Sequence, residues 1–226
     1  MNKGLYIKAA RGLLQLPIIM GLLLFVPAWT LDFWQAWVFV IVFFVCSLVI
    51  TVYLAVNDPK LLERRMKVGP AAETEKVQKI IMTLAMFSFA AALILPAIDH
   101  RLGWSHVPTA AVILGDLLIV VAYLVFYFVF RENTYGASTI QIAEDQKVIS
   151  TGPYAIVRHP MYSGALLSML GIPLALGSWW GLLTFVPAVA GLIGRLLHEE
   201  RFLTCNLAGY ADYTSKVHYR LVPFIW

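Results

Sequence analysis

The segment Gly-Pro-Tyr-Ala-Ile-Val-Arg-His-Pro-Met-Tyr-Ser-Gly, residues 152–164, stands between two long apolar runs of the chain. Polar and ionisable side chains are costly beside hydrocarbon, so a concentration of them at a membrane boundary predicts a functional site. The Gly-Pro pair ends any preceding helix. His159 precedes a proline and is biased to an extended conformation, and Pro suits the first position of a helix, so we expect a new helix to begin at Pro160.

The composition around this segment is that of an integral membrane protein. Of the 226 residues, 60% are hydrophobic and 13% are charged, whereas a soluble domain carries roughly 25% charged residues. Two cysteines, Cys46 and Cys205, are too few for a disulfide framework. Membrane topology explains the net charge of +4 better than an anionic partner does. We therefore expect no nucleic-acid partner, and we expect no metal site.

Apolar runs of about 18 or more residues predict membrane-spanning helices. Four runs meet this criterion, at residues 11–28, 34–56, 80–98 and 109–130. The first is long for a signal peptide, so we expect it to be an uncleaved helix.

A fifth apolar region, residues 161–197, is too long for one span. It contains Pro173, Gly177 and Gly181, so we expect a helical hairpin that turns near Leu176 to Trp180. The predicted fold is an all-α, polytopic membrane helical bundle with four spanning helices, a C-terminal helical hairpin and a cytoplasmic tail.

The basic residues predict the orientation, because Lys and Arg collect on the cytoplasmic side of a membrane. With a cytoplasmic N-terminus and a returning hairpin, 16 of the 17 Lys and Arg residues fall on that side, and Arg101 lies outside. We expect a multi-pass protein with both termini cytoplasmic, in a prokaryotic inner membrane rather than the endoplasmic reticulum. The basic stretch from Lys60 to Lys79 is then most simply a cytoplasmic loop.

A second polar motif, Arg-Leu-Leu-His-Glu-Glu-Arg at residues 195–201, ends the predicted hairpin. On a helix, Arg195 and Glu199 are four residues apart and share one face, so they can project into a pocket beneath the first motif. A guanidinium can hold a carboxylate ligand with paired hydrogen bonds. The structural alternative is an ion pair between the two on the surface. Glu200 and Arg201 are expected to face solvent.

Together the motifs resemble the isoprenylcysteine carboxyl methyltransferase family, to which the phosphatidylethanolamine N-methyltransferases are related. The likeness covers residues 115–226 and rests on the pattern at 152–164, on the Glu199-Glu200 pair, and on Tyr210 and Tyr213 ahead of Val222-Pro223. We accordingly predict N-terminal transmembrane helices over residues 1–110 and a C-terminal methyltransferase region with the cofactor site over residues 111–226.

The resemblance implies S-adenosylmethionine as the methyl donor. The matching donor-binding positions are Gln141, Gln146, Lys147, Val148, Ile149, Tyr154, His159, Pro160, Met161, Tyr162 and Glu199. Arg195 matches the substrate-binding arginine of the family, and Arg195 and Glu199 are the predicted catalytic residues. The eukaryotic enzymes have His where this chain has Gln146.

We therefore predict a methyltransferase whose partners are membrane lipids and a lipophilic acceptor, a small molecule or a lipidated one, that enters from the bilayer. Carboxyl O-methylation of an isoprenylcysteine-like substrate is the leading interpretation, because an ionised carboxylate needs no general base. An amine would need one, with His159 or Glu199 as candidates.

Four alternatives stay open: a phospholipid amine N-methyltransferase, a small-thiol methyltransferase, an NADPH-dependent membrane reductase of the sterol type, and a non-catalytic membrane protein. The reductases share His-Pro-x-Tyr but typically place Asn before the Tyr and Glu soon after the Gly, where this chain has Met161 and Ala165. No Gly-x-Gly-x-x-Gly fingerprint occurs, which argues against a soluble Rossmann methyltransferase domain.

Overall fold

The computed structural model describes residues 3–73, 75–136 and 146–226, and every regular element within these ranges is helical. The all-α prediction is confirmed. The long helices are α1 (Lys3–Ala28), α2 (Trp34–Asn57), α4 (Lys76–Leu102), α5 (Thr109–Glu132), α6 (Pro160–Ala175) and α7 (Phe185–Asn206). Shorter elements lie in the connections: α3 (Pro59–Met66), η1 (Pro70–Ala72), η2 (Gly152–Ala155), η3 (Trp180–Thr184) and α8 (Tyr210–Lys216).

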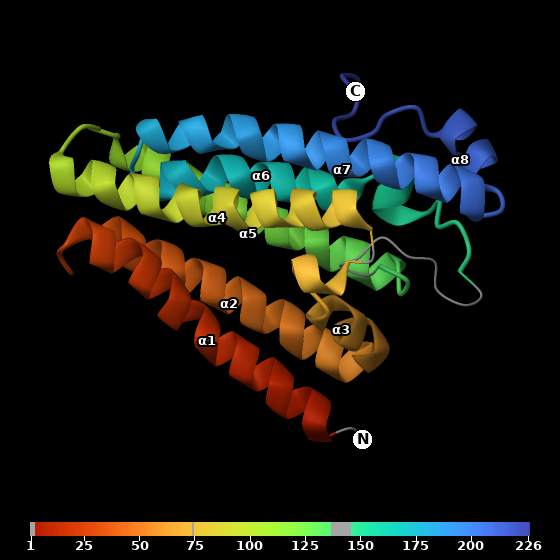
Figure 1. Ribbon diagram of the computed structural model, residues 1–226, viewed down its shortest axis with the longest axis horizontal. Coiled ribbons are helices and arrows are strands. Elements are labelled where there is room, and N and C mark those ends of the chain that lie inside the picture. Colours follow the sequence, from red (N-terminus) through yellow and green to blue (C-terminus); the bar gives the residue numbers. More distant parts are fainter. Residues whose placement is uncertain (1–2, 74, 137–145) are drawn as a thin grey trace.

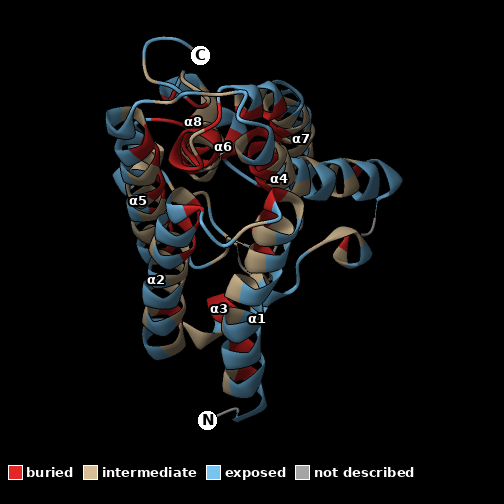
Figure 2. Cartoon of the chain, turned by 90° about the vertical axis from the view of Figure 1, so that its left-hand side faces the viewer, coloured by how far each residue is buried: buried red, intermediate tan, exposed pale blue. Residues whose placement is uncertain are grey.

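Five helices of the described chain are long and apolar enough to cross a membrane: α1, α2, α4, α5 and the continuous stretch Trp180–Asn206. The four predicted runs lie within the first four of these. Many of their outward faces are exposed (Figure 2), and the exposed side chains include large apolar ones such as Leu22, Val49, Phe87 and Leu117. Apolar surface of this kind suits contact with lipid, and the helices satisfy their own backbone hydrogen bonds. The chain is thus a multi-pass integral membrane protein.

The apolar region 161–197 forms α6, a turn and most of α7. The chain turns after Ala175, where Gly177 adopts a left-handed conformation with φ of 68°. Pro173 does not break the helix but lies in the last turn of α6. With 16 residues, α6 is about 24 Å long, shorter than the ~30 Å hydrocarbon core of a bilayer. The exact count of four spans plus a hairpin therefore stays a prediction.

The two ends of the bundle differ. Helices α3 and α8 lie toward the same end, on the right in Figure 1, and both termini lie in that half of the molecule. At the other end, the buried Asp99 carboxylate accepts hydrogen bonds from the Ser105 amide at 2.8 Å and from the hydroxyls of Ser105 and Ser178. Ser178 belongs to the turn after α6, so these bonds attach that turn to the end of α4.

Helices α5 and α6 pack backbone against backbone. A Cβ atom on Gly171 would lie 2.8 Å from the Gly115 carbonyl oxygen, and one on Gly164 would lie 2.7 Å from the Phe126 ring. A Cβ on Gly115 would overlap the backbone of Ala175. Small residues let membrane helices approach this closely, where dispersion contacts stabilise the pair. The close approach fixes the position of α6, and with it the segment from which α6 starts.

This packing predicts that Gly115→Ala destabilises the protein. Ala normally favours a helix by about 1 kcal/mol over Gly, but the added methyl collides with backbone that cannot move aside, at a cost of about 1–3 kcal/mol or more. We expect a lower Tm for the detergent-purified protein. Gly194→Ala is the matched control, because nothing lies within 4 Å of its added Cβ, and its Tm should be unchanged or slightly raised. Equal Tm changes in both variants would contradict the close approach.

Candidate active site

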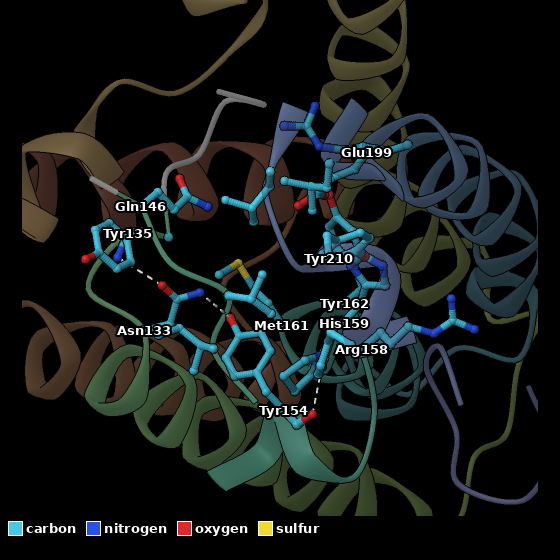
Figure 3. Close-up of a pocket in the computed structure, with 18 of the residues that line it drawn as sticks. Asn133, Tyr135, Gln146, Tyr154, Arg158, His159, Met161, Tyr162, Glu199 and Tyr210 are labelled. Atoms are coloured by element: carbon cyan, nitrogen blue, oxygen red, sulfur yellow. Dashed lines mark hydrogen bonds between the residues drawn. The ribbon is translucent and has the colours of Figure 1, made fainter. Parts of the chain in front are cut away.

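A cavity of about 340 Å³ lies at the start of α6, a volume within the usual range of small-molecule sites. Figure 3 shows its labelled side chains converging on one space. Eleven of the predicted site residues line it: Gln146, Lys147, Val148, Ile149, Tyr154, His159, Pro160, Met161, Tyr162, Arg195 and Glu199. Gln141 lies outside the described residues. The structure therefore brings the two predicted motifs together, while the binding role of each residue stays a prediction.

The segment before α6 is extended and is held by the C-terminal tail. Helix α6 begins at Pro160, as predicted, with His159 as its N-cap residue. The Arg158 amide donates to the Tyr219 carbonyl at 2.8 Å, and the His159 amide donates to the Arg220 carbonyl at 2.9 Å. The backbone on either side of the His159 side chain is thus fixed.

Glu200 is the charged centre of this region, and the prediction that it faces solvent is wrong. Its side chain is only 11% exposed. One oxygen accepts from Arg158 at 2.8 Å and lies 3.3 Å from Nε2 of His159, while the other accepts from Arg220 at 2.8 Å. Burying a carboxylate requires such compensation. Glu200 therefore joins α7, the Arg-His-Pro segment and the C-terminal tail.

Glu199 and Tyr162 form the wall of the cavity next to this cluster. The Tyr162 hydroxyl donates to the Glu199 carboxylate. The Tyr162 ring stacks near the His159 ring, with centroids 5.6 Å apart and an interplanar angle of 21°. His159 is buried, and its Nε2 faces Glu200 rather than the cavity. Glu199 thus presents a carboxylate to the cavity, while His159 contributes mainly its ring face.

Tyr154 forms the opposite wall. Its hydroxyl accepts from the Asn133 amide nitrogen at 2.9 Å (Figure 3), and its carbonyl accepts from the Tyr213 hydroxyl of α8 at 2.7 Å. Burial raises the pKa of Tyr154 to about 12, so the phenol keeps its proton at neutral pH. The preceding Gly152 has φ of 56°, and a Cβ there would lie 3.1 Å from the Glu132 carboxylate. This turn positions the ring.

Arg195 enters the cavity from α7, and only 11% of its side chain is exposed, so it does not lie on the surface. Its guanidinium donates to Glu73 and to the side-chain oxygen of Gln78, both at 2.9 Å. Glu73 and Gln78 are buried. The surface ion pair considered from the sequence is therefore wrong, and Arg195 is oriented by residues of the first half of the chain.

The connection between α2 and α4 and the start of α4 contribute to the cavity, which the sequence did not indicate. Arg65, Val68 and Met82 line the cavity, although all three lie before residue 111, where the methyltransferase region was predicted to begin. Arg65 donates to the sulfur of Met161 at 3.2 Å and lies 4.9 Å above the Phe130 ring. The stretch that was treated as a plain loop thus forms one side of the site.

A local signal for this element was present. Asp58 followed by Pro59 is a typical start of a helix, and the Asp58 side chain does cap α3 by accepting from the Leu61 amide at 2.9 Å. Leu61 and Leu62 of α3 are buried against the bundle. Their burial sets the orientation of α3, in which Arg65 reaches the cavity.

Comparison with known proteins defines the class. Residues 110–208 match the phospholipid methyltransferase family. This range contains every described residue that was predicted to bind the donor. The apolar helical bundle and this match together support a membrane methyltransferase.

Individual relatives agree with the resemblance seen in the motifs. Two proteins described as probable protein-S-isoprenylcysteine O-methyltransferases, from Oryza sativa subsp. indica and subsp. japonica, are each 27% identical over 169 residues. The aligned part covers 72% of this chain and 84% of each relative. The predicted resemblance to the isoprenylcysteine methyltransferases and related membrane methyltransferases is confirmed.

The Glu200 cluster predicts that Glu200→Gln destabilises the protein strongly. The neutral amide leaves the guanidinium groups of Arg158 and Arg220 without their counter-charge, and breaking a buried pair costs about 3–5 kcal/mol. We expect a large fall in the Tm of the detergent-purified protein. Glu63→Gln removes an exposed carboxylate and should change stability by less than about 1 kcal/mol. A Glu200→Gln variant as stable as Glu63→Gln would show that the cluster does not hold the tail and α7 together.

Proposed function

We propose that this protein transfers a methyl group from S-adenosylmethionine to the carboxylate of a lipophilic, isoprenylcysteine-like acceptor. The observation that carries the proposal is the charge of the cavity wall. Among the described residues, four basic side chains line it, Arg65, Lys147, Arg158 and Arg195, against one carboxylate, Glu199. Arg158 is paired with Glu200, and Arg195 with Glu73, but the excess of positive charge remains and favours an anionic acceptor.

The donor set of the cavity fits S-adenosylmethionine. Gln146, the backbone of residues 147–149 and the Glu199 carboxylate offer hydrogen-bonding groups for amino and hydroxyl groups, while Tyr154 and Tyr162 offer aromatic faces. The start of α6 adds the positive end of a helix dipole, which suits a carboxylate such as that of the methionine part.

S-Adenosylmethionine supplies a methyl group already activated on a sulfonium, so the protein has to align and desolvate the reactants. A carboxylate oxygen of the acceptor forms the new bond to the methyl carbon, the bond from carbon to sulfur breaks, and its electron pair stays on sulfur. An ionised acceptor loses no proton in this step. The cavity therefore needs no general base, and Arg195 serves to hold the carboxylate.

The placement of His159 also favours a carboxylate over an amine. Its Nε2 faces the Glu200 carboxylate at 3.3 Å, so this nitrogen is directed to a buried ion cluster and not to an acceptor. Glu199 already accepts from Tyr162. Each candidate base for an amine thus already has one polar contact within the protein.

Membrane topology supports the same reaction. The residues that line the cavity include those of α3 and of the start of α6, at the end of the bundle with α8 (Figure 1), to which the sequence assigns most Lys and Arg residues. Under the positive-inside rule this end faces the cytoplasm, where S-adenosylmethionine is available. A lipophilic acceptor would approach from the bilayer.

The proposal predicts that the detergent-purified protein binds S-adenosylhomocysteine and not NADPH, as measured by calorimetry. Glu199→Ala should weaken binding of S-adenosylhomocysteine at least about tenfold, because it removes a charged hydrogen-bonding group from the cavity. His159→Ala should weaken it as well, since it removes the ring that supports Tyr162. Binding of NADPH alone would support a reductase, and binding of neither compound near millimolar concentration would refute the methyltransferase proposal.

The role of Arg195 predicts a separation of donor binding from turnover. Arg195→Met should leave the Kd for S-adenosylhomocysteine within about twofold and lower kcat/KM for a carboxylate acceptor by about 10- to 100-fold, the worth of a charge-assisted hydrogen bond. Because Arg195→Met leaves the buried Glu73 without its cation, the variant is also made together with Glu73→Gln. Wild-type turnover in the double variant would remove Arg195 from substrate binding.

A further inference from the structure

Arg65 places a second guanidinium in the cavity, from a part of the chain distant in sequence from Arg195. Arg65 lies on α3 and Arg195 on α7, and both line the same space. The Arg65 side chain is held in position, since it donates to the Met161 sulfur at 3.2 Å and lies over the Phe130 ring. It therefore points into the site and not toward solvent.

The two guanidinium groups are close enough to affect each other. Burial lowers the pKa of Arg65, and the charge of Arg195 lowers it further. A guanidinium nevertheless keeps its proton in proteins, so two positive charges persist at one cavity. Glu73 pairs with Arg195 at 2.9 Å, and an anion bound between the two guanidinium groups would be attracted by both.

Arg65 lies at the boundary between the predicted donor positions, since its guanidinium contacts Met161, and the apolar part of the cavity lining. The cavity residues contributed by the first half of the chain and by the inner face of α5 and α6 include apolar side chains, among them Val68, Met82, Phe126 and Ala165. The polar groups assigned to the donor come from residues 146–149, 154 and 199. A lipophilic ligand with one anionic group matches these apolar side chains together with the Arg65 guanidinium.

We propose that Arg65 is a second acceptor-binding residue, which together with Arg195 holds the acceptor carboxylate and selects an anionic acceptor over an amine. This inference rests on the proposed carboxyl methyltransferase function. It makes the α3 segment, which lies outside the part of the chain that matches the phospholipid methyltransferase family, a determinant of acceptor choice.

The test uses full-length protein in detergent, tritiated S-adenosylmethionine, and N-acetyl-S-farnesylcysteine as the carboxylate acceptor. Arg65→Met should raise KM for this acceptor about tenfold or more while the Kd for S-adenosylhomocysteine stays within about twofold. Arg65→Lys keeps the charge but loses the planar pair of donors, so its KM should be intermediate. The carboxamide of the acceptor, used as a competitive inhibitor, should bind wild type less tightly than the acid does, and Arg65→Met should reduce that preference.

Arg64→Met is the matched control. Arg64 is the neighbouring arginine of α3, and its guanidinium donates to the Thr134 carbonyl at 2.7 Å without lining the cavity. Its KM should match that of wild type. Equal rises of KM in the Arg64 and Arg65 variants would show a general effect of charge on α3 and would overturn the inference.

The remaining outcomes separate this inference from the proposed function. If wild type binds S-adenosylhomocysteine and methylates the acid but Arg65→Met has an unchanged KM, the inference fails and the proposed function stands. A loss of donor affinity larger than the rise in KM would make Arg65 a donor-binding residue, which also overturns the inference.

If Arg65→Met does not fold, Arg65→Lys decides by the same comparison. Wild-type protein without donor binding or with methyl transfer only to phosphatidylethanolamine would refute the proposed function itself.

Discussion

The buried Glu200 carboxylate is the interaction on which the geometry of the candidate site depends. A carboxylate removed from water is stable only where cations and hydrogen bonds compensate it. Arg158 and Arg220 each donate to it at 2.8 Å, and His159 lies beside it. These partners come from the segment before α6 and from the C-terminal tail. One charge on α7 therefore fixes the relative position of three parts of the chain.

Two unlike constraints then determine where α6 lies. Its first residues are held by charge and by hydrogen bonds to the tail, and the rest of the helix is held by glycine-mediated contact with α5. The first constraint is polar and belongs to the membrane boundary, whereas the second operates where no water is present and packing dominates. Because both act on one short helix, Met161 and Tyr162 in its first turn have little freedom, and the cavity keeps its shape.

The sequence predicts most of the fold, because bilayer thickness imposes a minimum length on apolar helices. It also predicts which residues of the second half share a cavity. Residues at a fixed spacing within a motif keep their relative positions however the helices pack. It does not predict the partners of Arg195 and Glu200. Arg195 pairs with Glu73, more than 100 residues away in the sequence, and Glu200 pairs with Arg220 of the C-terminal tail. Helical geometry offered one hint: adjacent glutamates point about 100° apart on a helix, so Glu199 and Glu200 could not share one role.

The cavity is lined by residues from inside and from outside the part of the chain that matches the phospholipid methyltransferase family. The family match over residues 110–208 contains the described positions assigned to the methyl donor, and the donor would be common to all members of such a family. Arg65, Val68 and Met82 come from before that range, and Glu73 and Gln78, which orient Arg195, come from there as well. An acceptor differs in charge and shape from one methyltransferase to another. Under the proposed function, the acceptor side combines Arg195 from the matched range with residues from before it, so a change in the first half of the chain would alter the acceptor side while the described donor positions stay in place.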